Sequence, residues 1–202
     1  MTRRDTQQPT GATVAHPLHA HGGPAREIST LSQQVRDREL TQRLDRRLVR
    51  CQFPNVVLQS LHCTQVAIRH HLTGRVVIDF LPSGRTNPLQ NDARTTARRE
   101  HMKRLQLLGA RLAWPMTVVS DVPEALDLAD PYFDPGGMTL CDPELLIADA
   151  LGLPTVEDDA RRYRTLSLIV ERGSIQKVIL SAETNLEDQT RRIVAWMHAI
   201  GW

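Results

Sequence analysis

Three cysteines, Cys51, Cys63 and Cys141, are the most reactive residues of this 202-residue chain. A cysteine thiolate can attack a peroxide or a disulfide, and it can bind a metal ion. An odd number of cysteines without a CxxC pair argues against a disulfide framework and against a zinc site. Each cysteine is therefore predicted to be a reduced, partly buried thiol, because such cysteines usually behave as small hydrophobic residues.

Histidines form the second reactive set. The HxxHxH spacing of His16, His19 and His21 could bind a divalent metal ion weakly. The alternative is a polar tail without a ligand, and we predict that alternative, with no metal or other cofactor. A general-base role is open to His70–His71 and to His101, although His101 is predicted to lie on a helix and to face solvent.

The composition is that of a soluble globular protein, with 41% hydrophobic and 24% charged residues. A formal net charge of only +2 gives no global field that would attract nucleic acid. The apolar runs are too short to span a bilayer, and no apolar segment follows the N-terminal charges as in a secretory signal. We therefore predict a cytoplasmic protein with neither a nucleic-acid nor a membrane partner.

Three segments are expected to organise the chain. Residues 1–28 contain almost no large apolar residues and are predicted to be a disordered tail. Residues 29–50 are predicted to form a surface or dimer-contact helix, because leucines such as Leu44 and Leu48 recur at helical spacing. Residues 51–202 are long enough for one domain with its own core.

An α/β architecture is predicted for that domain. Residues 75–80 form a β-branched run that is typical of a buried central strand. Further strands are expected at 56–58, 65–68, 112–120, 138–141, 166–170 and 175–180, and helices at 92–108, 123–130, 142–152 and from Asn185. Helices between strands imply a mixed sheet with helices on both faces. The final hairpin followed by a helix is typical of the closing half of a thioredoxin fold.

Several short motifs follow one another in a characteristic order and spacing. They are Phe53–Val56, Gly74–Pro82, Leu107–Arg111, Leu140–Leu145, Ala150–Thr155, Tyr163–Val170 and Gly173–Val178. Together they resemble the peroxiredoxin (alkyl hydroperoxide reductase/thiol-specific antioxidant) family, in particular its peroxiredoxin-Q-like branch. The resemblance covers about residues 51–202, and it implies a peroxiredoxin-like thioredoxin fold with an N-terminal helical extension.

The sequence departs from this family at the site of its chemistry. A peroxiredoxin holds a cysteine thiolate at the start of the helix after the central strand, and in the resembling branch a second cysteine follows five residues later. Aligned on Leu107–Arg111 without gaps, these two positions fall near Asn91 and Thr96. Neither side chain can form a thiolate, and no cysteine lies between Cys63 and Cys141. Ordinary thiol peroxidase activity at this position is therefore excluded.

The former peroxide site could remain as a pocket for a small anionic or carbonyl-bearing molecule. A helix N-terminus presents free N–H groups and a positive end, which could also stabilise an oxyanion. The candidate catalytic residues are Asn91, Thr96, Arg99, Arg164 and Cys141, and the candidate ligand-binding residues are Arg85, Thr86, Asn87, Arg94 and Thr95. The alternative is a solvated polar surface in which Arg164 is a surface arginine and Cys141 an inert thiol.

Three functions remain open on the sequence. The first is a repurposed enzyme that acts on a small organic molecule without a cysteine, for which bacterial secondary metabolism would be a natural setting. The second is a non-catalytic thioredoxin-fold protein that binds a small ligand or a partner. The third is a residual thiol oxidoreductase that uses Cys63 or Cys141. A homodimer is expected in each case, because peroxiredoxins often dimerise.

Overall fold

The computed structural model describes residues 24–60, 64–81, 96, 100, 101, 103, 104, 114–120, 138–157, 160–181 and 186–201. The chain divides into two units, residues 1–34 and 35–202, and each is described by itself. Helix α1 (Pro24–Leu48) begins in the first unit and ends in the second. It starts before residue 29, where the sequence pattern placed its beginning. All contacts given below lie within residues 35–202.

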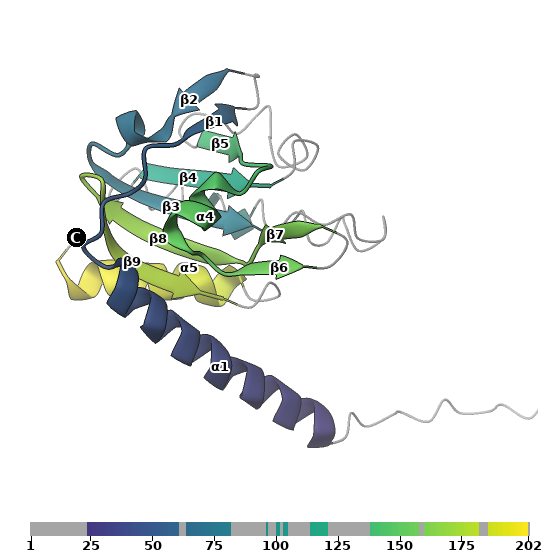
Figure 1. The fold of residues 1–202 in the computed structure, drawn as a ribbon. Coiled ribbons are helices and arrows are strands. Elements are labelled where there is room, and N and C mark those ends of the chain that lie inside the picture. Colours follow the sequence, from purple (N-terminus) through teal and green to yellow (C-terminus); the bar gives the residue numbers. More distant parts are fainter. Residues whose placement is uncertain are drawn as a thin grey trace, which may run out of the picture. The chain divides into compact units, whose positions relative to one another are not determined.

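A seven-stranded sheet forms the centre of the second unit, in the order β2-β1-β5-β4-β3-β8-β9 (Figure 1). The strands are β1 (Val57–Ser60), β2 (Gln65–Ala67), β3 (Arg75–Leu81), β4 (Trp114–Val119), β5 (Met138–Cys141), β8 (Leu166–Glu171) and β9 (Ser174–Leu180). Strands β3, β4 and β5 are parallel, and the other neighbours are antiparallel. This mixed sheet confirms the predicted α/β fold class.

Strand β3 lies between β4 and β8 and is buried over nearly its whole length. Its side chains alternate between the two faces of the sheet, as the pleat of a strand requires. Val76, Ile78 and Phe80 enter the larger hydrophobic core, whereas Val77 belongs to the smaller core on the other face. Asp79 shares that second face with Val77. The hydrophobic run that predicted a central strand therefore contains one carboxylate in a buried position.

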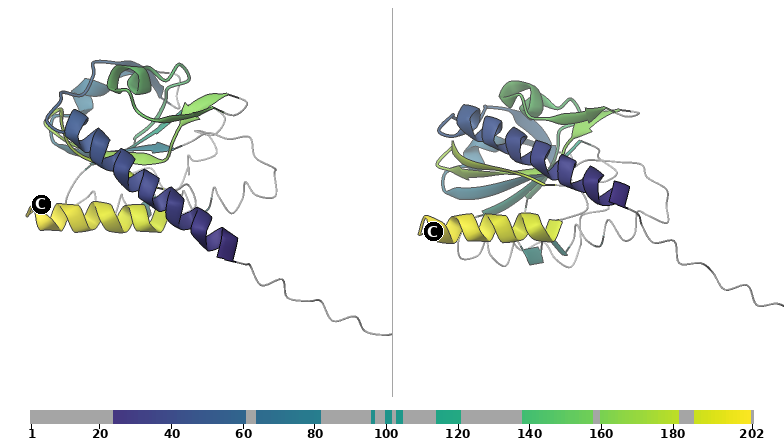
Figure 2. Two further views of the ribbon diagram at one scale, coloured as in Figure 1. Left: turned by 60° about the horizontal axis from the view of Figure 1, so that its bottom comes forward. Right: turned by 90° about the horizontal axis from the view of Figure 1, so that it is seen from below.

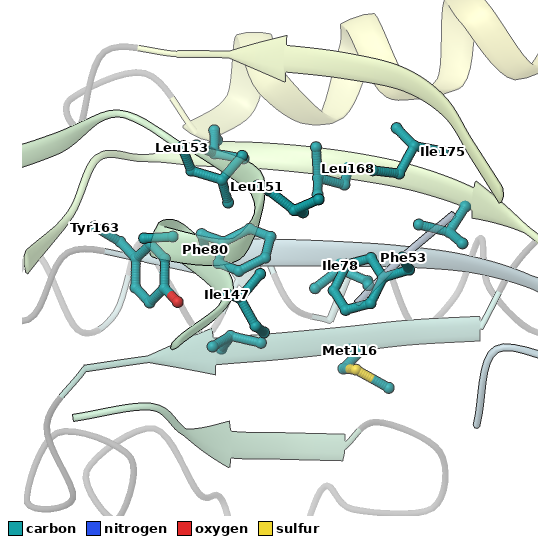
Figure 3. Packing of buried hydrophobic residues seen from close by; sticks show 14 of the residues in the cluster. Phe53, Ile78, Phe80, Met116, Ile147, Leu151, Leu153, Tyr163, Leu168 and Ile175 are labelled. Carbon is teal, nitrogen blue, oxygen red and sulfur yellow. The ribbon is translucent and has the colours of Figure 1, made fainter. Parts of the chain in front are cut away.

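The larger core fills the face of the sheet that is covered by the short helix α4 (Leu146–Leu151). Ile147 and Leu151 of this helix pack over the side chains of β3 (Figure 3). The rings of Phe80 and Tyr163 have centroids 4.8 Å apart and are tilted by 49°, a favourable arrangement for two aromatic rings.

Helix α5 (Leu186–Ala199) covers the opposite face (Figure 2). Its residues Ile193 and Met197 pack against Val77 of β3 and Ile169 of β8. The hairpin and terminal helix therefore close the fold as predicted, with helices on both faces. Among the residues that the structure describes, no helix combines the length and hydrophobicity that crossing a bilayer requires.

Helix α4 begins later than predicted. The sequence pattern placed its start at Asp142, but the first helical residue is Leu146. Leu145 has a φ of 54°, in the left-handed region, so the chain turns before the helix can begin. The side chain of Asp142 still caps the helix, as its position before Pro143 suggested.

A small two-stranded sheet was not predicted. It consists of β6 (Thr155–Glu157) and β7 (Arg161–Tyr163), which pair in antiparallel orientation. Both strands are three residues long and mostly polar, so they carry no hydrophobic alternation that sequence analysis could detect.

Candidate functional site

Most of the predicted site residues lie outside the described residues. They are Arg85, Thr86, Asn87, Asn91, Arg94, Thr95 and Arg99. Thr96 is helical, and its side chain is exposed. Two further candidates, Arg164 and Cys141, can be placed.

Arg164 is held by helix α1. Its Nη2 atom lies 2.8 Å from Oδ1 of Asp37, and the two side chains are only 25% and 14% exposed. A partly buried, hydrogen-bonded ion pair of this kind orients the guanidinium. In this structure Arg164 therefore contributes to docking the C-terminal half of α1 within the second unit.

Cys141 is buried in β5, with 1% of its surface exposed. It pairs in register with Val119 of β4. A thiolate is stabilised by solvent, a cation or a helix N-terminus, and buried structural cysteines are usually inert. Cys51, in contrast, is exposed, and its Sγ donates to the carbonyl of Arg47 at 3.1 Å. Cys63 lies outside the described residues.

A row of polar side chains crosses the sheet on the α5 face. Asp79 of β3 is in register with Thr117 of β4 on one side and with Ser167 of β8 on the other, and Thr117 is in register with Thr139 of β5. All four residues are buried. Because β3, β4 and β5 are parallel, three members of the row lie on strands whose carboxyl ends point the same way. In open α/β sheets that end is where ligands bind.

His101 completes a polar network at the centre of this row. Its Nε2 lies 2.9 Å from Oδ2 of Asp79, and its Nδ1 lies 2.6 Å from Oγ1 of Thr190 on α5. The imidazole is 2% exposed and the carboxylate 1%. The prediction that His101 faces solvent is therefore wrong, because the helix presents this side chain to the sheet.

The second oxygen of Asp79 is also bonded. Ser167 donates its hydroxyl proton to Oδ1, and Nε2 of Gln189 lies 3.4 Å from the same oxygen. Gln189 also donates to the hydroxyl oxygen of Ser167. The carboxylate therefore accepts from three side chains that come from different elements, which holds α5, β8 and the helix of His101 together around one buried acid.

The contacts of Thr190 indicate the direction of its bond with His101. The hydroxyl of Thr190 donates to the carbonyl of Leu186 at 3.1 Å, so its oxygen is left to accept from Nδ1 of His101. Nε2 of His101 forms the second hydrogen bond of the ring, to Oδ2 of Asp79.

Gln189 supplies one unsatisfied group. Its Oε1 is buried without a hydrogen-bond partner among the described residues, and the side chain is 0% exposed. Reversing the amide would place its oxygen against the carboxylate of Asp79, so the present orientation is favoured. A buried acceptor without a donor costs about 1–3 kcal/mol, and such groups in native proteins are commonly associated with function or bound water.

A second buried carboxylate lies on the other face of the sheet. Asp142 accepts from the backbone N–H groups of Leu146 at 2.8 Å and of Ile147 at 3.0 Å, and from the hydroxyl of Tyr163 at 2.5 Å. Burial, and then the charge of Asp142, raise the pKa of Tyr163 well above its ordinary value of 10.0. The three hydrogen bonds of this carboxylate stabilise the start of α4 and satisfy the hydroxyl of Tyr163, so we assign Asp142 a structural role.

Stability is expected to fall at high pH because of Tyr163. The folded chain keeps the phenol proton at pH values where the unfolded chain, with an ordinary pKa near 10, has lost it. Its contribution is therefore complete below about pH 10 and declines above it by about 1.4 kcal/mol per pH unit. Urea unfolding of wild type and Tyr163→Phe from pH 8 to pH 11 tests this. The stability difference between them, about 1–3 kcal/mol at pH 8, should narrow above pH 10, and a constant difference would contradict the assignment.

No group of three or more His, Cys, Asp or Glu side chains within the described part of the chain is arranged to hold a metal ion. The candidate site is therefore the network of Asp79, His101, Ser167, Gln189 and Thr190. Sequence analysis singled out only His101 of these five, and it placed that residue in solvent. The bonded members Asp79 and Gln189 are 110 positions apart, so no local sequence spacing could reveal the network.

Solved structures with a similar fold include peroxiredoxins. BcpB of Mycobacterium tuberculosis, described as a peroxidoxin, is 17% identical, with a TM-score of 0.58 over 77% of this chain and 99% of its own. Reduced Prx3 of Vibrio vulnificus is 18% identical, with a TM-score of 0.57 over 74% of this chain and 97% of its own. The bacterioferritin comigratory protein of Xanthomonas campestris, studied for alkyl peroxide reduction, is 16% identical, with a TM-score of 0.56 over 75% of this chain and 98% of its own.

No protein-family model and no curated protein matches the sequence. At these identities the solved structures show the fold alone, and that fold is the peroxiredoxin-like thioredoxin fold that the sequence motifs predicted.

Proposed function

We propose that this peroxiredoxin-like chain is an enzyme that acts on a small organic molecule without a cysteine nucleophile. We assign the His101–Asp79 pair as its acid–base group. The observation that carries the proposal is a buried imidazole 2.9 Å from a carboxylate, with a hydroxyl 2.6 Å from its other nitrogen. A carboxylate that orients an imidazole is a recurring arrangement in general acid–base catalysis.

The position of the pair supports the proposal. Asp79 lies two residues before the end of β3, and the chain that leaves this strand leads to the residues near Asn91. In the resemblance to peroxiredoxins, that segment forms the reactive site. Along the chain, Asp79 precedes the segment where a thiolate would otherwise act, and His101 follows it.

A substrate can reach the imidazole only by displacing one of its hydrogen-bond partners. Both ring nitrogens are bonded, so a substrate has to replace one partner of His101. Asp79 is held by two further donors, whereas Thr190 keeps its own bond to the carbonyl of Leu186 when it gives up the bond to His101. Thr190 is therefore the partner that a substrate group would replace, which makes Nδ1 the nitrogen that exchanges a proton with the substrate.

The same burial favours a second function. An imidazole that is 2% exposed, with both nitrogens hydrogen-bonded, is also compatible with a purely structural role. In that case the chain is a non-catalytic protein that binds a small ligand or a partner. The residual thiol function is less well supported, because Cys141 is buried; replacing Cys51, Cys63 and Cys141 should leave any activity unchanged.

Activity of matched histidine variants tests the proposal. Purified protein is screened with p-nitrophenyl acetate, small 2-oxo acids, and hydrogen peroxide with dithiothreitol. We expect turnover of a carbonyl substrate, a fall of about 10²–10⁴-fold in His101→Gln, and no change in His71→Gln, which makes the same replacement at an exposed site. The amide introduced by His101→Gln can still donate to Asp79, so the fold should survive. Undiminished turnover in His101→Gln would overturn the catalytic role, and folded protein without turnover of any probe would favour the binding function.

A further inference from the structure

Strand β9 is the last strand of the seven-stranded sheet and so has one edge without a strand neighbour. Such an edge exposes backbone N–H and C=O groups that can pair with a strand of another chain. Figure 1 shows the C-terminal end of α1 beside this edge.

The segment after α1 pairs with the first part of β9. Ile175 donates its N–H to the carbonyl of Cys51 at 2.9 Å, and its own carbonyl accepts from the N–H of Arg50 at 2.7 Å. Phe53 donates to the carbonyl of Gly173 at 2.7 Å, just before the strand. Arg50 has a φ of 72°, a left-handed conformation that ends the helix and turns the chain onto β9.

Side chains meet two further backbone groups of the edge. Oδ1 of Asp45, on α1, accepts from the N–H of Val178 at 2.9 Å, and Oδ2 forms an ion pair with Lys177. At the far end, Nη1 of Arg192 donates to the carbonyl of Leu180 at 2.8 Å. Intrachain partners thus meet backbone groups of Ile175, Val178 and Leu180 along this edge.

The covering segment is itself firmly held within the unit. Leu44 and Leu48 belong to the larger hydrophobic core and are each 4% exposed. Arg47 donates to the carbonyls of Leu151 and Gly152 at 2.9 and 2.6 Å. The ion pair between Asp37 and Arg164 adds a third attachment.

We propose that residues 37–53, the edge cover, together with Arg192 of α5, close strand β9 against pairing with a second copy of this chain. A carboxylate that accepts the amide of an edge strand occupies the place of the carbonyl that a neighbouring strand would supply. Any self-association of the native chain therefore uses another surface. Opening the edge cover creates a strand edge complementary to itself, and the partner it fits is the β9 edge of a second copy in antiparallel orientation.

Asp45 offers a variant with a matched control. Asp45→Ala removes the acceptor from Val178, whereas Asp45→Asn keeps a carbonyl oxygen there and loses only the ion pair with Lys177. The full-length variants are compared by sedimentation over a series of protein concentrations, and by amide hydrogen exchange at micromolar concentration. We expect exchange at Val178 to be at least tenfold faster in Asp45→Ala, with a mass that rises with concentration, and we expect Asp45→Asn to match wild type in both measurements.

Two results would overturn the proposal. One is an Asp45→Ala protein that keeps the exchange rate and mass of wild type. The other is association of Asp45→Asn to the same extent, because the charge rather than the amide acceptor would then prevent it. If Asp45→Ala does not fold, Arg192→Ala decides, since it uncovers the carbonyl of Leu180: association over the same concentrations supports a closed edge, and an unchanged mass refutes it.

Discussion

Replacing Asp79 by alanine is expected to destabilise the folded chain by about 3–5 kcal/mol. The carboxylate is 1% exposed and accepts from His101, Ser167 and Gln189. Its removal leaves these donors buried without an acceptor, and each unsatisfied group costs about 1–3 kcal/mol. Since domains of this size have a total stability of about 5–15 kcal/mol, the loss is a large fraction of the whole.

Urea unfolding of Asp79→Ala measures this loss, and Asp149→Ala is the matched control. Asp149 carries the same side chain on α4, but it is 58% exposed, and its ion pair with Arg161 lies in solvent. Exposed pairs contribute about 0–1 kcal/mol, so the control should stay within that range. If Asp79→Ala unfolds completely, Asp79→Asn, which keeps one acceptor oxygen, should give a smaller and measurable loss.

A double-mutant cycle with His101 separates the pair from the rest of the network. Asp79→Ala and His101→Ala should couple by about 1–3 kcal/mol, because the second replacement removes a group that the first has already left unsatisfied. Strictly additive effects would contradict a direct Asp79–His101 bond. A loss for Asp79→Ala no larger than that for Asp149→Ala would contradict the whole network.

Asp142→Ala is expected to cost about 1.5–5 kcal/mol. Loss of the cap on α4 accounts for about 0.5–2 kcal/mol, and the buried hydroxyl of Tyr163, left without its acceptor, for a further 1–3 kcal/mol. Asp142 is 0% exposed, so water cannot replace these bonds. The lost cap frees the first N–H groups of a helix only six residues long, which has few other hydrogen bonds.

Combining Asp142→Ala with Tyr163→Phe tests how the destabilisation divides between the lost cap and the unsatisfied hydroxyl. In the Tyr163→Phe background the Asp142→Ala loss should shrink to the capping contribution, because no phenol hydroxyl remains to be satisfied. Asp142→Asn keeps one acceptor oxygen and should lie between wild type and Asp142→Ala. If Asp142→Ala costs less than about 1 kcal/mol by urea unfolding, the carboxylate neither caps α4 nor satisfies Tyr163.

Local patterns predicted the elements whose residues carry a strong and continuous signal. The β-branched run at 75–80 forms a central strand because it is buried on both faces, and the hairpin of β8 and β9 turns at Arg172–Gly173, where both residues have positive φ. The start of α4 was placed too early, because a cap residue indicates that a helix follows but not how many residues the turn between them takes.

The candidate site was largely beyond reach of sequence analysis. His101 was assigned to solvent because the polar side of its helix reads as exposed, and Asp79 reads as an interruption in a hydrophobic strand. His101 and Asp79 find their hydrogen-bond partners only because α5 and the helix of His101 pack on the same face of the sheet. A buried polar residue is tolerated when its partner arrives from a distant part of the chain, and that partner leaves no mark at a fixed spacing.

By itself, the sequence determined the α/β fold class, the order along the chain of the seven strands of the main sheet, and the absence of a cysteine between Cys63 and Cys141. These follow from hydrophobic periodicity and from residue identity, which are local properties. Only the tertiary structure decided that His101 and Asp79 form a buried pair and that Asp45 meets the edge of β9. Both are contacts between elements, and they depend on which faces and edges the packed sheet brings together.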